Sequence, residues 1–511
     1  MLAWRAHLAT VPGFLALALL LLPYALLCRS ALGVSLADGV WLWSTFDGKS
    51  LAAIGTSLAL SATVAALSVV LAVLVLTALS HVVCRGWVWA VLAALALNFC
   101  LSPVIHLVAW RELTGAEQLP GFLAAVVVLS WKYFPLALAV LLLGLHALDA
   151  SGIEAGRVFS RRGEALRHLV FPQVVPAISA AAAIILVLVF GEAEVPPLLG
   201  MRVYAEEFMA RLALEPDIGR ALPAALPFVV AALAGWGLTV RSVAGYSVLA
   251  WDRSALKPLS TYVQSARHPR VLAGALFVLV CAPVLLLAFA ALPGGFVQFL
   301  PKHGHALATS ALLGVLSTAV ALAVGGMVST LFAAVGPALR RTVLSLLLLG
   351  LFMPGALTGL GMVALSQSPA FDWLNTGDVL LVATHVLRLL PVAALLLIGL
   401  ALLEPRRWAE EVRLLGIPCW PRWRFIHAPL RWPRWLLVGG VLMALALSEL
   451  ASTILVVAPG TETAVLRLYN LMHFGSPESV AALAFSQAGL VVAVLVAVAA
   501  AAIGRSGHAG A

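Results

Sequence analysis

The chain has 511 residues, of which 63% are hydrophobic and only 10% are charged, and its mean hydropathy is +1.06. A soluble domain carries about 25% charged residues, so this composition excludes a soluble globular protein and predicts a polytopic membrane protein. The formal net charge is +9, which we attribute mostly to membrane topology rather than to nucleic-acid binding. The five cysteines have no CxxC or Cys/His spacing, so neither a disulfide framework nor a metal site is predicted.

Apolar runs of membrane-spanning length occur twelve times along the chain. The first six are at 11–28, 54–80, 87–109, 121–146, 174–198 and 222–247. The second six are at 271–293, 306–334, 342–366, 379–403, 434–458 and 479–503. The predicted fold class is therefore an all-α polytopic membrane protein with about twelve transmembrane helices. Lys and Arg are concentrated in the connections on the same side as the N-terminus, which predicts that both termini face the cytoplasm.

An internal repeat relates the two groups of spans. Two intervals recur, namely Pro135 to Glu154 with Pro391 to Glu410, and Pro172 to Glu192 with Pro429 to Glu449. Because each half has an even number of spans, both halves share one orientation and the repeat is parallel. We therefore predict a first domain at 1–250, a cytoplasmic linker at 251–270 and a second domain at 271–511.

Shorter features repeat within the same frame. The pair Thr56-Ser57 in the first half has a counterpart in Thr309-Ser310, and Pro103 has a counterpart in Pro354. Prolines inside spans are expected to kink the helices. Matched kinks suit segments that rearrange, although a purely architectural role is equally compatible with them.

The connection at 404–432 has a defined pattern. A short helix is predicted from Trp408 to Leu415 and is broken by Gly416, and a basic aromatic segment leads from Glu410 through Ile426 to Pro429. This pattern resembles the EAA loop of ABC importer permeases, in which Glu, Gly, Ile and Pro occupy these four places. Three positions of the family pattern are filled differently, by Glu411, Val412 and Ala428.

The connection at 148–173 offers the equivalent loop of the first half. Its matching residues are Glu154, Ala155 and Pro172, while Ser160 stands where the family pattern has Gly. In the family this loop docks into a separate ATP-hydrolysing subunit and couples it to the spans. The resemblance therefore implies a coupling role for both loops.

The resemblance extends over nearly the whole chain, because the stretch from Arg467 to Gly475 also looks like that of the fused, double-length permeases of ferric iron and thiamine importers. It implies two fused six-helix permease domains of the type I, MetI-like kind in a bacterial inner membrane. It also implies two copies of an ABC ATP-binding subunit and a periplasmic substrate-binding protein as partners. Ferric iron is the first expectation for the substrate, and thiamine is the second.

The chain itself is expected to bind no cofactor and to perform no bond chemistry. The only Gly-Lys-Ser, at Gly48, lacks the first glycine of a P-loop. ATP is therefore expected to be used by a partner subunit, or an ion gradient replaces it.

Five ionisable residues at bilayer depth are candidates for a pathway or gate. Lys132 and Arg388 occupy equivalent positions, where they either line the pathway or extend their stems to the interface. Glu192, Glu194 and Glu449 either meet a cationic substrate or pair with these two cations across the halves.

Two other classes of function remain as rivals. A twelve-span secondary transporter driven by an ion gradient can also be built from two parallel halves. It would be expected to place coupling carboxylates deep among the helices, whereas the centres of most spans here lack acids. A membrane-embedded enzyme would need a His/Asp/Glu or Ser/His constellation at one depth, and the sequence offers none.

Overall fold

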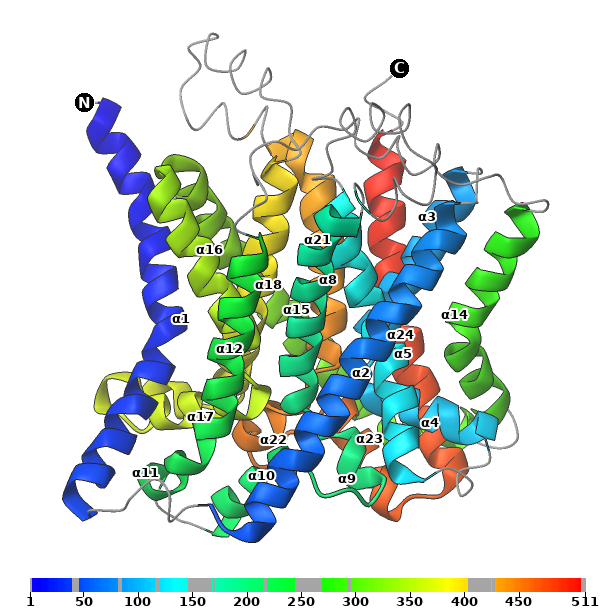
Figure 1. Cartoon of the computed structure of the whole chain (residues 1–511), viewed down its shortest axis with the longest axis horizontal. Coiled ribbons are helices and arrows are strands. Elements are labelled where there is room, and N and C mark those ends of the chain that lie inside the picture. The colour runs from blue at the N-terminus through cyan, green and yellow to red at the C-terminus, as the bar shows by residue number, and fades with distance from the viewer. Residues whose placement is uncertain are drawn as a thin grey trace.

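The computed structural model of the protein consists of helices, with no strand among the residues it describes. These residues are 2–38, 46–80, 85–114, 120–145, 168, 171–214, 218–243, 269–291, 296–402, 424 and 428–506. The long helices run roughly parallel to one another, with shorter helices gathered at the lower end in Figure 1. The protein is therefore an all-α membrane protein, as its composition predicts.

Ten α-helices belong to the described residues of the first half. They are α1 (Leu2–Asp38), α2 (Gly48–Ser80), α3 (Arg85–Cys100), α4 (Pro103–Thr114), α5 (Gly121–Leu145), α8 (Phe171–Phe190), α9 (Val195–Leu198), α10 (Tyr204–Leu214), α11 (Ile218–Ala221) and α12 (Leu226–Val243), with the 3-10 turn η3 (Leu222–Ala225) before α12.

The second half repeats this order. Its helices are α14 (Pro269–Ala291), α15 (Phe296–Ala334), α16 (Pro337–Phe352), α17 (Gly355–Ser366), α18 (Val379–Leu402), α21 (Ala428–Leu447), α22 (Thr453–Val456), α23 (Ala464–Phe474) and α24 (Pro477–Ser506), with the 3-10 segment η5 (Pro369–Asn375) after α17. The predicted linker at 251–270 lies almost entirely outside the described residues.

Eight of the described helices are long and apolar enough to cross a membrane, and two bent pairs raise this number to ten. The predicted spans at 271–293 and 434–458 correspond to α14 and α21, which are not among these ten. The predicted run at 434–458 is also not one helix, because α21 ends at Leu447 and the short α22 follows. Similarly, the helix in the predicted run at 174–198 ends at Phe190.

The third and ninth predicted spans are not continuous helices. The chain turns by 104° between α3 and α4 and by 100° between α16 and α17. Each break comes at a matched proline, Pro103 or Pro354, which cannot donate the helical N–H bond and disfavours a helical conformation in the residue before it. The prolines predicted to kink these spans therefore end them, whereas Pro135 and Pro391 lie inside α5 and α18.

The internal repeat is visible in the packing. The helices α2, α5 and α8 pack on one another in the first half, as α15, α18 and α21 do in the second. Two serines make equivalent bonds between elements. Ser57 Oγ of α2 accepts the N–H of Tyr204 at the start of α10 (2.8 Å), and Ser310 Oγ of α15 accepts the N–H of Ala464 at the start of α23 (2.7 Å). The repeated Thr-Ser pairs thus carry the same structural bond.

The first helix of each half packs against the other half. The helix α1 lies on α15 and α17, and α14 lies on α3 and α4 as well as on α24. Gly13 of α1 lies very close to α15, because a Cβ at this position would be 2.5 Å from the Cβ of Leu331. This close approach shows that the halves are interlocked rather than merely adjacent.

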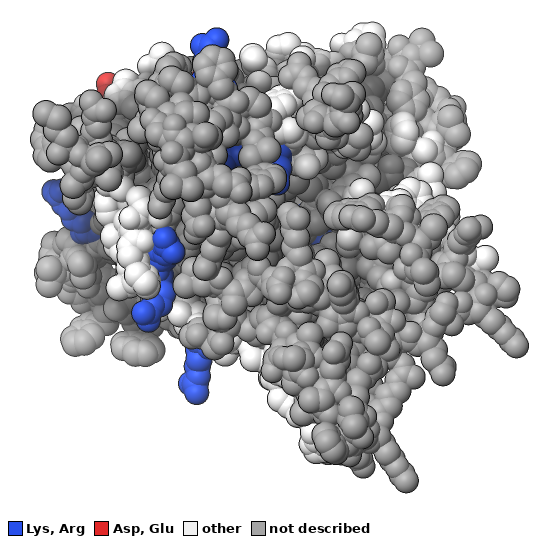
Figure 2. Space-filling model, turned by 90° about the horizontal axis from the view of Figure 1, so that it is seen from above, with Lys and Arg blue, Asp and Glu red and all other residues white. Residues whose placement is uncertain are grey.

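The first and the last described helices have their terminal ends at the same end of the molecule. The helix α1 begins there and α24 ends there, at the top of Figure 1. The helix ends that flank both predicted coupling loops lie at the same end. Figure 2 shows this end from above, where Lys and Arg prevail over Asp and Glu among the described side chains in view.

Candidate functional site

The two breaks leave helical carbonyl groups without their usual N–H partners, and a cation from the neighbouring span binds each of them. The Nζ of Lys132 in α5 donates to the carbonyl oxygens of Phe99 (3.2 Å) and Leu101 (2.5 Å). The guanidinium of Arg388 in α18 donates to the carbonyl oxygen of Met353. A positive charge is favourable at the negative end of a helix dipole. Because lipid contains no water that could bond these carbonyl groups, a donor from the protein is needed.

Lys132 is buried. Only 7% of the residue is exposed, and its ammonium lies over the rings of Phe99 (5.6 Å) and Tyr133 (5.7 Å). The ammonium of Lys132 is thus held against the break between α3 and α4, where the broken helix offers carbonyl acceptors.

Arg388 also forms an ion pair with Glu449, with its Nε 3.6 Å from Oε2. The other carboxylate oxygen of Glu449 accepts the backbone N–H (3.2 Å) and the hydroxyl (3.0 Å) of Ser452. Both partners of this pair belong to the second half. The pair therefore lies within one half, whereas the sequence predicted a pair across the two halves.

The other two carboxylates lie just beyond α8 and are buried. Glu192 accepts hydrogen bonds from the Tyr133 hydroxyl (3.4 Å) and from the backbone N–H of Glu194 (3.0 Å). Glu194 accepts one from the hydroxyl of Ser102 (3.5 Å), which stands at the break between α3 and α4. The first half thus surrounds its carboxylates with hydroxyls, and Lys132 interacts with both electrostatically.

The residues that precede the matched carboxylates contact the opposite half. Ser448, before Glu449, donates its hydroxyl to the carbonyl oxygen of Cys100 at the end of α3 (2.7 Å). Gly191, before Glu192, lies so close to the second break that a Cβ there would be 3.1 Å from the side chain of Pro354. Both carboxylates therefore stand at the seam between the halves.

The charges at this seam form one cluster, since Lys132 also interacts electrostatically with Glu449 of the other half. Three carboxylates face two cations, and we call these five residues the seam cluster: Lys132, Glu192, Glu194, Arg388 and Glu449. Unpaired charge is costly in a medium of low dielectric. The structure thus brings all five sequence-predicted pathway or gate candidates together.

Several polar partners of the cluster were not singled out from the sequence. They are the hydroxyls of Tyr133, Ser102 and Ser452, which bond its carboxylates. Their common sequence signal is a hydroxyl close to a break or a span end. That signal is weak because many such residues only bond their own helix, as Thr56 does with the carbonyl of Ala52.

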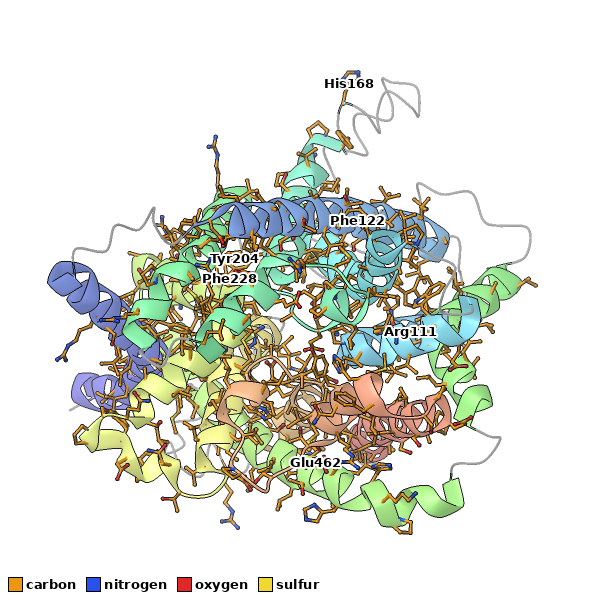
Figure 3. The ribbon with its side chains drawn as sticks, turned by 90° about the horizontal axis from the view of Figure 1, so that it is seen from below. Arg111, Phe122, His168, Tyr204, Phe228 and Glu462 are labelled. Atoms are coloured by element: carbon orange, nitrogen blue, oxygen red, sulfur yellow. The ribbon has the colours of Figure 1, made fainter. Side chains whose placement is uncertain are left out.

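The lower end of the molecule holds the short helices. Seen from below in Figure 3, Tyr204 of α10 and Phe228 of α12 lie together in the first half, and their rings are 5.3 Å apart. Glu462, which pairs with Arg467 at 3.0 Å, lies on the opposite side in the second half. Burial raises the pKa of the Tyr204 hydroxyl, which donates to the carbonyl oxygen of Ala224.

Most residues predicted to couple the chain to an ATP-hydrolysing subunit lie outside the described residues, namely Glu154, Ala155, Ser160, Glu410, Gly416 and Ile426. Pro172 and Pro429 are described, and they lie in the first turns of α8 and α21. Each loop therefore connects two helices that pack on each other, α5 with α8 and α18 with α21.

Comparison of the chain with protein-family models, curated proteins and solved structures finds no match. Within the described part of the chain, no group of three or more His, Cys, Asp or Glu could hold a metal ion. The repeat, the loop sequences and the seam cluster therefore remain as the features that indicate a function.

Proposed function

We propose that the chain is the fused, double-length permease of an ATP-driven importer in a bacterial inner membrane, with both termini in the cytoplasm. A periplasmic binding protein delivers a small solute, and two copies of a separate ABC ATP-binding subunit supply the energy. Ferric iron is the first candidate for the solute and thiamine is the second. The observation that carries the proposal is the repeat, in which each half has an EAA-like sequence between two packed helices whose adjoining ends lie at one end of the molecule.

The connectivity suggests how the loops would act. Each loop follows the helix that carries a cation bound to a helix break, Lys132 on α5 or Arg388 on α18. Each loop precedes the helix that ends at a seam carboxylate, Glu192 after α8 or Glu449 after α21. Movement of a loop with its ATP-binding subunit would therefore be carried along both helices to the seam, where it shifts the cations relative to the breaks.

Co-purification tests the partner. The wild-type chain and the double variant Glu410→Ala with Gly416→Pro are purified in detergent, and any associated ATPase activity is measured. We expect a P-loop subunit to accompany the wild type and to be lost or uncoupled in the variant. The control is Arg341→Ala, which removes an exposed cation from the start of α16. Absence of any P-loop subunit from the wild-type preparation would refute the importer.

A secondary transporter remains the second candidate, because the structure buries Glu192 and Glu194 beside Lys132. Buried carboxylates near a cation suit ion coupling. Uptake into proteoliposomes distinguishes the two candidates. The importer requires ATP and the ATP-binding subunit, whereas the secondary transporter works with the chain alone and stops when an ionophore collapses the gradient.

A further inference from the structure

The helices α5 and α18 each contain one proline, Pro135 or Pro391, near the middle of the span. A proline has no N–H, so the carbonyl group four residues before it loses its helical donor. These carbonyls belong to Trp131 in α5 and to Leu387 in α18. In a membrane such a group needs a donor from a neighbouring helix, and without one the helix is easier to bend at that place.

The first half supplies the donor. Nδ2 of Asn98 in α3 donates to the carbonyl oxygen of Trp131 (2.9 Å), and only 2% of Asn98 is exposed. Asn98 is itself held in place, because its own carbonyl oxygen accepts a hydrogen bond from Nε2 of His106 in α4 (2.9 Å). The side chain of Asn98 therefore replaces the hydrogen bond that Pro135 removes from α5.

The second half has a different residue at the matched position. Asn98 stands five residues before Pro103, and the residue five before Pro354 is Leu349. A leucine side chain cannot donate, and no other side chain among the described residues bonds the carbonyl of Leu387. The carbonyl that Pro391 leaves open thus has no counterpart of the Asn98 bond.

The next residue along α3 and α16 increases this difference. The ring of Phe99 in α3 lies 5.6 Å from Nζ of Lys132, and its carbonyl oxygen accepts from the same ammonium (3.2 Å). The matched residue of α16 is Gly350, where a Cβ would be only 3.0 Å from Cγ of Pro391. The ring of Pro391 therefore lies against a residue that has no side chain to hold α18.

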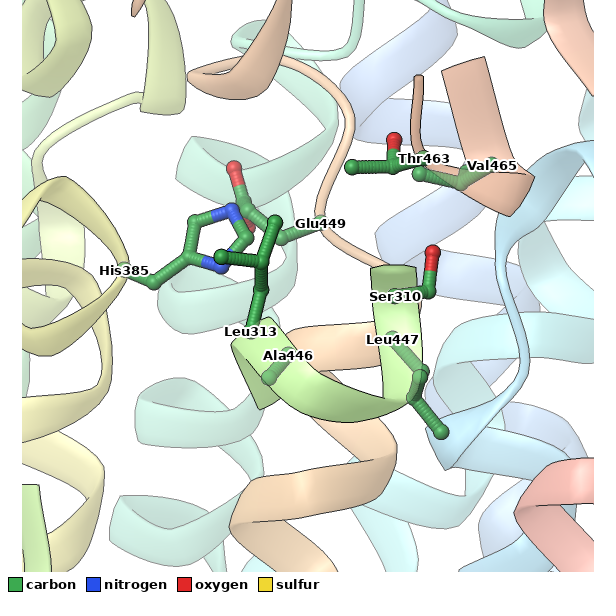
Figure 4. A pocket seen from close by; sticks show the side chains of 8 residues that line it. All are labelled: Ser310, Leu313, His385, Ala446, Leu447, Glu449, Thr463 and Val465. Atoms are coloured by element: carbon green, nitrogen blue, oxygen red, sulfur yellow. The ribbon is translucent and has the colours of Figure 1, made fainter. Parts of the chain in front are cut away.

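The part of α18 before Pro391 is fixed to the segment that follows α21. Nε2 of His385 and the hydroxyl oxygen of Thr453 are 2.9 Å apart, and Arg388 forms its ion pair with Glu449. His385 and Glu449 also line one small pocket (Figure 4). This part of the helix is therefore tied to the seam.

The part of α18 after Pro391 has no comparable contact. No residue at 392–402 has a polar side chain, so none can form a side-chain hydrogen bond or an ion pair. This part leads directly to the connection at 404–432, which holds the second EAA-like sequence. A tied part and an untied part of one helix therefore meet at Pro391.

We propose that α18 bends at Pro391, whereas Asn98 prevents α5 from bending at Pro135. The part of α18 that carries Arg388 stays at the seam, and the part after Pro391 moves with the connection at 404–432. The helix α5 moves as one body together with Lys132. The hinge goes beyond the proposed import, because it is a property of this chain alone.

The consequence for coupling rests on the proposed function. Movement of the first loop would reach the seam through α5 and α8. Movement of the second loop would reach it through α21, because the bend at Pro391 absorbs the displacement of α18. The two loops would then contribute unequally to transport.

Hydrogen exchange of the purified chain in detergent, measured by mass spectrometry, tests the hinge without a partner or a substrate. The stretches 136–140 and 392–396 follow the matched prolines and are similarly buried. After correction for intrinsic rates, we expect 392–396 to exchange about fivefold faster, on the order of the effect of one hydrogen bond. Equal exchange, or faster exchange at 136–140, would overturn the proposal. A missing ATP-binding subunit cannot affect this result, so it is independent of the importer test.

A variant that copies the second half tests the role of Asn98. Asn98→Leu introduces the residue found at the matched position and should raise exchange at 136–140 about fivefold, with 392–396 unchanged. The control Gln487→Leu removes another buried amide, which donates to the carbonyl oxygen of Leu447 (2.8 Å), and should leave both stretches unchanged. An unchanged 136–140 in Asn98→Leu, or an equal rise in both stretches, would contradict the role of Asn98.

The two prolines allow a test that leaves Asn98 in place. Pro391→Ala gives the carbonyl of Leu387 a helical N–H again, so exchange at 392–396 should slow about fivefold or more. Pro135→Ala should change exchange at 136–140 little, because the carbonyl of Trp131 already has a donor. Equal slowing in the two variants would show that both helices bend alike, whatever the stability of Asn98→Leu.

Discussion

Two cations within the spans bind the open carbonyl ends of broken helices. Lys132 binds the end of α3 and Arg388 binds the end of α16. Arg388 also pairs with Glu449, and Lys132 interacts electrostatically with Glu192 and Glu194, so each cation links a helix break to an acid. This dual use explains why charged residues stand where a bilayer makes them expensive.

Removal of Arg388 is expected to destabilise the fold strongly. In Arg388→Met, Glu449 keeps its bonds from Ser452 but loses its counter-charge, and the carbonyl of Met353 loses its donor. Breaking a fully buried pair from one side costs about 3 kcal/mol or more, and because these side chains are 21% and 18% exposed we expect a loss somewhat below that. Urea unfolding in detergent measures the loss.

The matched variant for this experiment is Glu449→Gln, which keeps an acceptor for Ser452 and leaves Arg388 its carbonyl. We expect a smaller loss from Glu449→Gln, and a double variant less damaged than the two single losses added together. Additive losses would mean that the contact at 3.6 Å carries no coupling.

At the scale of elements, hydroxyls fix the short lower helices to the spans. Ser57 accepts the first N–H of α10, and Ser310 accepts that of α23. The first N–H groups of a helix have no partner within it. A serine from a neighbouring span thus both completes and positions each helix.

Replacing either serine by alanine should cost about 1 kcal/mol, because a buried N–H loses its acceptor. The chain offers a control in Ser317→Ala on α15. Ser317 is buried, but its hydroxyl has no partner among the described residues, so its loss should be neutral or stabilising. Unfolding by urea compares the three variants, and an equal cost for Ser317 and Ser310 would refute the role of the bond.

The start of α2 is expected to depend on pH. Asp47 accepts the hydroxyl (2.6 Å) and the backbone N–H (2.9 Å) of Ser50, and these bonds lower the pKa of its carboxyl, the hydroxyl bond most. A lowered pKa means that the cap stabilises α2 above the ordinary carboxyl pKa and is lost as the pH falls through the lowered one.

Hydrogen exchange measures this effect at the Ser50 amide. Its protection, corrected for intrinsic exchange rates, should fall on acidification in the wild type. In Asp47→Asn it should be nearly independent of pH in the same range, because the amide oxygen still accepts but does not titrate. Equal pH dependence in both proteins would show that another group controls the first turn.

The elements were predictable to different degrees. Eight of the predicted spans, or ten with the bent pairs, are confirmed as helices of membrane-spanning length in the described residues, and the matched prolines indicated distortion near Pro103 and Pro354. The sharpness of the turns and the carbonyl partners of Lys132 were not predictable, because they depend on which helices are neighbours. Hydropathy cannot supply that information, since lipid-facing and helix-facing positions are equally apolar.

The same limit applies to the site. The repeat in sequence singled out Lys132, Arg388 and the three glutamates, and the structure collects them at one seam. The sequence did not indicate that Arg388 pairs within its own half, nor that His385 shares a pocket with Glu449. Both facts arise from how α18, α21 and α22 pack.

The molecule as a whole is interlocked by its first helices. The helix α1 packs on α15 and α17, and α14 packs on α3 and α4. Ser448 and Gly191 add two contacts at matched places on the seam. Each half alone would therefore expose both the surface that receives the other half's first helix and the charged residues of the seam.

Separate expression of 1–250 and 251–511 tests this interdependence. Co-expressed halves are expected to associate in equal amounts, because each supplies a helix that the other lacks. Expressed alone, each half should aggregate or be degraded, since unpaired carboxylates and open helix surfaces are exposed together. A variant pair with Gly13→Leu should associate less well, because a Cβ at this position already meets Leu331 and the backbone of Met327. A half that is stable and monodisperse alone would show that it does not need the other half to fold. Movement at the loop of one half would then not have to be transmitted to the other half.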